Sequence, residues 1–295
     1  MAYFNGLGQG RVGWKSPISG GGLTPSYLLD TYSGAAAAYS LRKLRTAYTG
    51  NAIRVRRSSD NTAQDIGFKA DGTLDTATML SFVGSGNGFV SIWYDQSGGG
   101  YNATENASAS QPQIIDSGSV LMINSKPSMK WSGAQNIRST PPSVANLTTL
   151  ALITVVKPTN PNIQFGYYSH VYFPDNGGWG GIFQTATNLG KVGYRFGTGQ
   201  SSNNNIYSMT VNNLIFGTYK NGSTEIARVN GSDVMTSIGS KLSSIGNTIT
   251  TLNMGLGEGG TYFNGLQNEV IFYRVNKISD RIGIESNINT YYSIY

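Results

Sequence analysis

Two Asn-Gly steps, Asn221-Gly222 and Asn230-Gly231, lie between runs in which apolar and polar residues alternate. This dipeptide favours the two-residue turn of a β-hairpin, because both of its positions accept a positive φ angle. A further run, from Leu150 to Val156, is apolar on both faces, as expected of a central strand that is covered on both sides. No long helical pattern separates the strands, so their sheets should be antiparallel. These patterns predict an all-β chain folded as an antiparallel β-sandwich (jelly roll).

Two or three short helices are predicted to accompany the strands. The first runs from about Gly34 to Tyr48 with Ser33 as its N-cap, and the second begins with Asp75 as its cap. A third follows Asp280 and extends to about Tyr292, with one apolar stripe. The side chains expected on the buried faces of these helices are Leu41, Leu44 and Tyr48; Met79, Leu80, Phe82 and Val83; and Ile284, Ile288 and Tyr291.

Two strands are predicted in the N-terminal third. In the first, Ile53 and Val55 face inward while Arg54 and Arg56 face the other side. The second, from Gly88 to Asp95, is expected to alternate without interruption. Its two faces then carry Val90, Ile92 and Tyr94 on one side and Phe89, Ser91 and Trp93 on the other.

Charged residues make up only 12% of the chain, whereas glycine is abundant, with 39 residues. This composition is typical of an all-β protein with many turns, whose surface carries amides and hydroxyls rather than ions. The sequence contains no cysteine, so the fold must be stable without disulfide bonds. No N-terminal stretch has the apolar core of a signal peptide, and no run reaches the ~18 residues of a membrane span. Folding in a cytoplasm and no insertion into a membrane are therefore expected.

The positive charge is concentrated towards the N-terminus. Residues 1–70 contain nine lysines and arginines but only three aspartates, whereas positive and negative residues balance in the rest of the chain. Arg42, Lys43 and Arg45 are interpreted as a solvated helix face, with docking onto an acidic partner surface as the alternative. No nucleic-acid reading motif accompanies them, so nucleic acid is not expected as a partner.

Residues 1–25 are rich in glycine and cannot form a core, yet they carry four large apolar side chains: Tyr3, Phe4, Val12 and Trp14. Because a free tail gains nothing from such side chains, the segment is interpreted as an arm that anchors the chain to other proteins. Plain disorder is the alternative. The sandwich domain then covers residues 26–295, and a homo-oligomer is expected.

Two polar phrases, at residues 54–67 and 91–98, stand out in a chain with few charges. In the first phrase, Arg56, Arg57, Asp60 and Asp65 are interpreted as structural ion pairs. Guanidinium and carboxylate groups on a half-buried sheet commonly form bidentate pairs of this kind.

The second phrase and its neighbours are candidates for binding a sugar. Aromatic faces stack on sugar rings, and carboxylate and amide groups form hydrogen bonds with paired hydroxyls. The alternative is that strand alternation buries Tyr94, while Asp95 and Ser97 only turn the chain. The candidate glycan-binding residues are Trp93, Tyr94, Asp95, Gln96, Tyr101, Asn102 and Trp179.

The residues of the two phrases and the spacing between them resemble the N-terminal half of the α-L-arabinofuranosidase B catalytic domain, glycoside hydrolase family 54. The resemblance covers residues 35–102, and more loosely the closing phrase from Tyr262 to Gly265. It implies a concanavalin-like β-sandwich. It also implies an enzyme that removes arabinose side chains from plant polysaccharides.

The carboxylates needed for that chemistry are sparse. Retaining glycosidases use two carboxyl groups about 5.5 Å apart. The resembled family takes its nucleophile from the middle of the domain, where residues 117–224 of this chain contain only Asp175. Asp175 is therefore the one catalytic candidate.

Two further sequence patterns bear on cofactor and metal binding. The run from Gly255 to Gly260 matches G-x-G-x-x-G, but the sequence after it is strand-like, so it does not predict a dinucleotide site. His170 is the only histidine, which excludes a multi-histidine metal site. Neither a cofactor nor a metal is expected.

These observations favour a non-catalytic, structural or glycan-binding component of a bacteriophage particle: a head fibre, a capsid decoration or a tail adhesin. Such a component is made in the host cytoplasm, resides in the virion, contacts other virion proteins through the N-terminal arm and has a host-surface glycan as its candidate ligand. The alternative is an α-L-arabinofuranosidase-type glycoside hydrolase that acts on polysaccharide side chains.

Overall fold

A computed structural model describes residues 27–141, 144–147, 149–159, 167–175, 178–185, 192–195, 214–221, 224–238, 245–249, 251–256 and 262–295. For most residues of β12, β14 to β17, β19 and β20 it describes the backbone alone. The predicted arm, with Tyr3, Phe4, Val12 and Trp14, lies outside the described residues.

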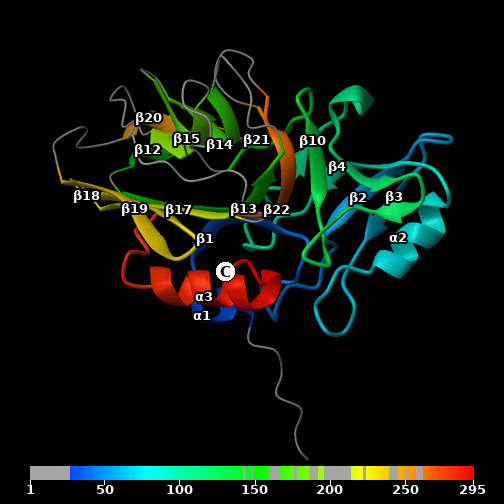
Figure 1. Ribbon diagram of the computed structural model, residues 1–295, viewed down its shortest axis with the longest axis horizontal. Coiled ribbons are helices and arrows are strands. Elements are labelled where there is room, and N and C mark those ends of the chain that lie inside the picture. The colour runs from blue at the N-terminus through cyan, green and yellow to red at the C-terminus, as the bar shows by residue number, and fades with distance from the viewer. Residues whose placement is uncertain are drawn as a thin grey trace, which may run out of the picture.

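The molecule is a β-sandwich whose strands pair antiparallel throughout the described part of the chain (Figure 1). Its central strands are β13 (Thr149–Pro158) and β22 (Asn264–Tyr273). Beyond β13 the ladder continues through β17 (Leu214–Asn221), β18 (Thr224–Val229) and β19 (Ser232–Ile238). On its other side, β22 pairs with β1 (Ala35–Ser40) and with β10 (Met129–Ser132).

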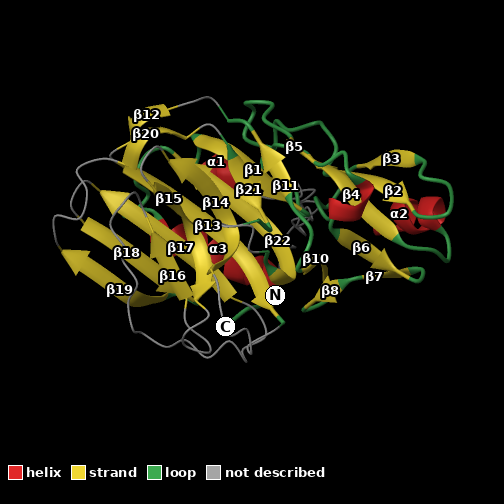
Figure 2. Cartoon of the chain, turned by 90° about the horizontal axis from the view of Figure 1, so that it is seen from above, coloured by secondary structure: helices red, strands yellow, loops and turns green. Residues whose placement is uncertain are grey.

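A lobe formed by the N-terminal third extends from β10. There β10 meets β6 (Gln113–Asp116), which pairs with β7 (Ser119–Val120) and with β4 (Gly88–Trp93). β4 in turn pairs with β2 (Ile53–Arg57), and β2 pairs with β3 (Ala63–Ile66). Figure 2 shows this lobe, with helix α2 (Thr76–Val83), at the opposite end of the molecule from β18 and β19.

The second layer also begins at β4. It runs through β5 (Ala103–Thr104), β11 (Ile137–Ser139), β21 (Leu252–Met254), β14 (Tyr167–Asp175) and β15 (Gly178–Thr185) to β16 (Val192–Arg195). Two short pairs stand apart, β12 (Val144–Leu147) with β20 (Ile245–Ile249) and β8 (Met122–Ile123) with β9 (Lys126–Pro127). The predicted hairpins are confirmed, because β17 pairs with β18 and β18 with β19. Asn230 and Gly231 form the turn between β18 and β19, both with positive φ, whereas Asn221 is the last residue of β17 and pairs with Thr224.

Strand β13 divides the interior into two cores, as its doubly apolar sequence predicts. Leu150, Leu152 and Val156 pack into the core between the two layers, together with Trp93 and Trp131. The alternate residues of β13 pack into a second core under α1 (Leu28–Thr31) and α3 (Arg281–Tyr292). Figure 1 shows α1 and α3 covering the outer face of this sheet.

The predicted helix from Gly34 to Tyr48 is wrong, because its alanine-rich first half forms strand β1. Ala37 and Tyr39 lie in the core between the layers, whereas Ala38 lies in the core under the helices. The small alanine side chains fit between these two cores, and backbone pairing with β22 overrides their helix propensity. Helix α1 (Leu28–Thr31), which lies just before this strand, is not predicted by any pattern in the sequence.

The other two predicted helices are confirmed. Asp75 caps α2 by accepting a hydrogen bond from the backbone N–H of Thr78 at 3.1 Å. α3 ends at Tyr292, and its buried stripe includes Ile284 and Ile288. In the part of the chain that the structure describes, neither these nor any other helix combines the length and the apolar character of a membrane span.

Candidate functional site

Trp93 lies in the sandwich core and cannot stack on a sugar. Its side chain is fully buried, and its ring centroid lies 5.7 Å from that of Tyr39. A β-bulge between β2 and β4 causes this, because Arg54 pairs with Ile92 whereas Val55 pairs with Val90. The extra residue, Ser91, changes the phase of the alternation. Val90 and Trp93 therefore both point inward, and the predicted uninterrupted alternation is wrong.

Asp95 is buried and joins strand β1 to the turn that follows β4. Its Oδ1 atom accepts hydrogen bonds from the backbone N–H of Ala38 and of Ser97, both at 2.9 Å. Its Oδ2 atom accepts from the Ser97 hydroxyl at 2.7 Å and from the backbone N–H of Tyr101 at 3.1 Å. With both oxygens used in this way, Asp95 organises the backbone and is not positioned to bind a glycan hydroxyl.

Gln96 has a similar structural role. Its Oε1 atom accepts from the backbone N–H of Leu44 at 2.8 Å. Its Nε2 atom donates to the backbone carbonyls of Ser40 and Arg42, both at 3.0 Å. The side chain of Gln96 is fully buried, so it fixes the loop after β1.

The remaining residues of the second phrase also support the turn. Tyr94 donates its hydroxyl to Asp65 at 2.7 Å, and Asn102 accepts from the backbone N–H of Asp95 at 3.0 Å. Tyr101 contributes its backbone N–H to Asp95 and its carbonyl to the hydroxyl of Tyr39. The structure thus brings these residues together around Asp95 rather than around an open sugar site.

The first phrase forms two ion pairs, which differ in part from those predicted. Arg57 binds Asp60 with Nη2 and Oδ2 2.6 Å apart. Asp65 is bound by Arg54, its direct cross-strand neighbour, through two hydrogen bonds of 2.8 and 3.0 Å. Arg56 does not join an ion pair. It donates to the amide oxygens of Gln111 and Asn61 and stacks over Phe89.

The pair between Arg54 and Asp65 makes a pH-dependent contribution to stability. Burial acts to raise the pKa of Asp65, but hydrogen bonds from Arg54 and Tyr94 more than offset it and hold the pKa below its usual value. A depressed pKa stabilises the fold above the pKa of the unfolded chain, and this stability is lost as the pH falls through the folded pKa. Urea unfolding of the Asp65→Asn variant should show a deficit near neutral pH that shrinks at about pH 3, below the ~3.9 of an unfolded aspartate. An equal deficit at both pH values would show that charge is not the cause.

Arg42 is buried, so its interpretation as part of a solvated helix face is wrong, and so is the alternative that it docks onto an acidic partner. Its Nε and Nη2 atoms donate to the two carboxylate oxygens of Glu269 at 2.8 and 3.1 Å. Burial acts to lower the pKa of Arg42, but the charge of Glu269 more than offsets it and raises the pKa above its usual value. Glu269 also accepts from the hydroxyls of Ser40 and Tyr292.

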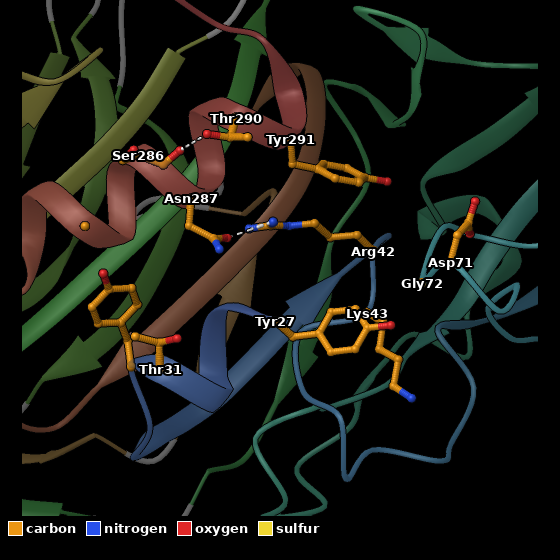
Figure 3. Close-up of a pocket in the computed structure, with 12 residues that line it drawn as sticks. Tyr27, Thr31, Arg42, Lys43, Asp71, Gly72, Ser286, Asn287, Thr290 and Tyr291 are labelled. Carbon is orange, nitrogen blue, oxygen red and sulfur yellow. Dashed lines mark hydrogen bonds between the residues drawn. The ribbon is translucent and has the colours of Figure 1, made fainter. Parts of the chain in front are cut away.

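Above this ion pair lies a hollow of about 530 Å³, which we call the helix-side hollow (Figure 3). Segments far apart in the sequence form its walls: α1, the loop after β1, the loop after β3, and α3. The hollow is lined by Tyr27, Thr31, Tyr32, Arg42, Lys43, Asp71, Gly72, Gly283, Ser286, Asn287, Thr290 and Tyr291.

Aromatic rings and cations alternate along these walls. The guanidinium of Arg42 lies 4.9 Å from the ring centroid of Tyr291, and the ammonium of Lys43 lies 5.5 Å from that of Tyr27. Burial raises the pKa of the Tyr291 hydroxyl to about 12, although the charge of Arg42 opposes this shift. The hydroxyl is therefore neutral at physiological pH and can donate a hydrogen bond.

The hollow has the size and composition of a binding site for a small polar molecule. Among the described residues that line the hollow, Asp71 is the only carboxylate, so these residues do not supply the carboxyl pair of a glycosidase. Within the described residues, no group of three or more possible metal ligands is present. Sequence patterns could not reveal this site, because no local motif links its four segments.

Several candidates lie where the structure describes no side chain. Asp175 ends β14, Trp179 lies in β15, and His170 lies in β14. Their roles remain predictions. Most of the glycine-rich run from Gly255 to Gly260 lies outside the described residues, and the next element that the structure describes is strand β22.

Comparison with known proteins relates the N-terminal third to a hydrolase family. Residues 30–122 match a family model described as "Alpha-L-arabinofuranosidase B, catalytic". A probable alpha-L-arabinofuranosidase B of Aspergillus flavus is 41% identical over 71 residues, which cover 24% of this chain and 14% of that protein. The alpha-L-arabinofuranosidase B of Aspergillus oryzae is 39% identical over 71 residues, with the same shares of each chain. The match thus spans only a small part of the curated relatives.

Solved structures extend the likeness to most of the fold. A mutant of a family 54 α-L-arabinofuranosidase soaked with 4-nitrophenyl α-L-arabinofuranoside superposes with a TM-score of 0.70 at 15% identity. An arabinofuranosidase complexed with arabinofuranosyl-α-1,2-xylobiose gives a TM-score of 0.65, also at 15% identity. Each match covers 86% of this chain and 62% of the solved chain. At this identity, the likeness shows the fold alone, and it bears out the predicted concanavalin-like sandwich.

These matches contradict the prediction of a bacteriophage component. The relatives are hydrolases of Aspergillus, not head fibres, capsid decorations or tail adhesins. A location in the virion is contradicted by the same finding. The glycan-binding interpretation of Trp93, Asp95 and Gln96, on which the prediction partly depended, is wrong because these side chains are buried.

Proposed function

We propose that this chain is an α-L-arabinofuranosidase-type glycoside hydrolase, which removes arabinofuranosyl side chains from plant polysaccharides. The observation that carries this proposal is the match of residues 30–122 to the arabinofuranosidase B catalytic model. The sandwich fold, which is similar over 86% of the chain to that of a family 54 enzyme, supports it. The buried network of Asp95 and Gln96 lies inside the matched segment and gives that segment a scaffolding role.

The reaction requires one carboxyl group that donates a proton and a second that acts as nucleophile or base. Every carboxylate whose side chain the structure describes accepts a hydrogen bond or an ion pair from neighbouring groups, and we infer a structural role for these carboxylates. The remaining carboxylates of the sequence are Asp175, Glu225 and Glu258. Asp175 lies in β14 and Glu225 in β18, and the structure describes only the backbone of these two residues, whereas Glu258 lies outside the described residues. We assign the catalytic pair to this set.

Hydrolysis of 4-nitrophenyl α-L-arabinofuranoside tests the proposal. The wild type should release 4-nitrophenol. Two of the three variants Asp175→Asn, Glu225→Gln and Glu258→Gln should lose about 10²–10⁴-fold in kcat, the usual contribution of a catalytic acid or base. The Asp116→Asn variant is the matched control, because Asp116 lies in β6, outside the helix-side hollow, and its rate should equal that of the wild type.

Two outcomes would refute this assignment. Absence of turnover by the wild-type protein would refute the proposed hydrolase function itself. Turnover that persists in all three variants would leave the activity but overturn the choice of carboxylates. Circular dichroism of each variant separates a loss of chemistry from a loss of fold.

A further inference from the structure

A second hollow adjoins the helix-side hollow. This second hollow has a volume of about 340 Å³ and shares Tyr27 and Lys43 with the first. It is lined in addition by Tyr48, Thr49, Gly50, Asn51, Gly67, Phe68, Lys69 and Ala70. The two adjoining hollows are together called the groove, with Tyr27 and Lys43 in the wall that they share. A groove of two adjoining hollows suits successive units of a chain better than one compact ligand.

Aromatic rings occur along the whole groove and are held in place by the fold. In the second hollow, Tyr48 packs edge-on against Phe68 with their centroids 6.4 Å apart, and it donates its hydroxyl to the carbonyl of Asn51 at 2.7 Å. At the junction, Gly72 has a φ angle of +81°, and a Cβ atom there would lie 2.7 Å from Tyr27. The absence of a side chain at Gly72 thus leaves room for the ring of Tyr27. Rings fixed in this way present the part of their apolar surface that lines the hollows at low cost in conformational entropy, while Arg42 and Lys126 lie over the ring of Tyr291 and Lys43 over that of Tyr27.

Hydrogen-bonding groups lie beside these rings. Ser286, Asn287 and Thr290 project from α3 into the first hollow (Figure 3). The Oδ1 atom of Asn287 accepts from Nη1 of Arg42 at 2.9 Å, which orients the amide and leaves its NH2 group as a donor. The hydroxyl of Thr290 donates to the carbonyl of Ser286 at 2.7 Å and keeps its lone pairs as acceptors. Amide and hydroxyl groups beside aromatic faces are suited to the alternating apolar and hydroxyl surfaces of a sugar chain.

The charges of the groove nearly cancel, which argues against an acidic ligand. Arg42 is neutralised by Glu269 directly beneath the first hollow. Hydrogen bonds from Thr73, and to a lesser extent the charge of Lys69, hold the pKa of Asp71 below its usual value, so Asp71 is ionised. Among the described lining residues, the remaining charged groups of the groove are the cations of Lys43 and Lys69 and the carboxylate of Asp71. The net charge of the groove is therefore too small to select a polyanion.

We propose that this groove binds a neutral oligosaccharide segment, the main chain of a polysaccharide, as an accessory site outside the catalytic centre. The proposal rests on the proposed function only for the choice of polysaccharide. Binding there would keep the enzyme on a polymer while its side chains are removed. Main-chain binding and catalysis would then be separable by mutation.

Calorimetric titration with xylohexaose tests the groove. The wild type should bind this neutral probe, and the Tyr27→Ala variant should bind it at least about 10-fold more weakly, equivalent to about 1.4 kcal/mol. The Tyr295→Ala variant is the matched control, because Tyr295 is exposed and lies outside both hollows. It should bind as the wild type does.

A second variant keeps the proposal testable if Tyr27→Ala does not fold. Ser286 is exposed on α3 and lines the first hollow, so Ser286→Trp should block binding without disturbing the core. Ile282→Trp is its control, since Ile282 is 64% exposed on the same helix and lies outside the lining.

Three results would contradict the proposal that the groove binds an oligosaccharide. They are no binding of xylohexaose by the wild type, unchanged binding by both Tyr27→Ala and Ser286→Trp, or salt-sensitive binding of polygalacturonate in place of xylohexaose. Turnover of 4-nitrophenyl α-L-arabinofuranoside, measured on the same preparations, keeps the two proposals apart. If only the groove proposal is wrong, turnover is still observed. If only the proposed hydrolase function is wrong, xylohexaose still binds and its binding still depends on Tyr27.

Discussion

Replacing Glu269 with glutamine is expected to lower the free energy of unfolding by about 3–5 kcal/mol. The carboxylate is fully buried and accepts hydrogen bonds from Arg42, Ser40 and Tyr292. The Glu269→Gln variant leaves the guanidinium of Arg42 buried without its counter-charge, and an uncompensated buried charge is far more costly than a lost surface ion pair. Urea unfolding followed by tryptophan fluorescence measures the change.

Two controls isolate the cause of this loss. The double variant with Arg42→Met and Glu269→Leu removes both charges and should recover at least half of the loss, because an apolar pair can occupy such a site. The Asp60→Asn variant breaks the exposed pair with Arg57 and should leave the unfolding midpoint almost unchanged. If Glu269→Gln were no less stable than Asp60→Asn, the ion pair would not organise this core.

The second large effect is expected at Asp95. The Asp95→Asn variant should lose about 3 kcal/mol of stability, because the neutral amide cannot accept all the hydrogen bonds that converge on the carboxylate. The backbone N–H of Ala38 is the critical donor, since it lies in the buried strand β1 and is bonded to Asp95 at 2.9 Å. Thermal unfolding followed by circular dichroism, with the wild type measured in parallel, gives the difference.

Ser97→Ala is the matched control for Asp95. It removes the hydroxyl that donates to Asp95 at 2.7 Å and leaves the three backbone donors in place, so its effect should be about 1 kcal/mol or less. The folded fraction of Asp95→Asn should keep the wild-type kcat on an aryl arabinofuranoside. A stable Asp95→Asn protein with a reduced kcat would indicate that Asp95 takes part in the chemistry.

Much of the sandwich could be predicted from local patterns. The apolar run of β13, the Asn-Gly turns around β18 and the cap at Asp75 each reflect short-range rules that the tertiary structure respects. Strand β1 could not be predicted in this way. Its alanines favour a helix in isolation, and only the pairing with β22, more than 200 residues away, makes the segment a strand.

The candidate site was harder to predict, for two physical reasons. Aspartate, glutamine and tryptophan serve equally well in an open sugar site and in a buried turn network, and a single bulge at Ser91 decided that Trp93 is buried. The groove depends on Tyr27, Lys43, Phe68 and Tyr291, which lie on four separate segments that only the tertiary fold brings together. No spacing in the sequence carries that information.

Release of L-arabinose from arabinoxylan tests the central claim most directly. The protein is incubated with the polymer, and monosaccharides and oligosaccharides are separated by anion-exchange chromatography. An arabinofuranosidase-type hydrolase should release free arabinose while the xylose main chain stays intact. Absence of arabinose, or the appearance of xylose oligomers in its place, would contradict the assignment.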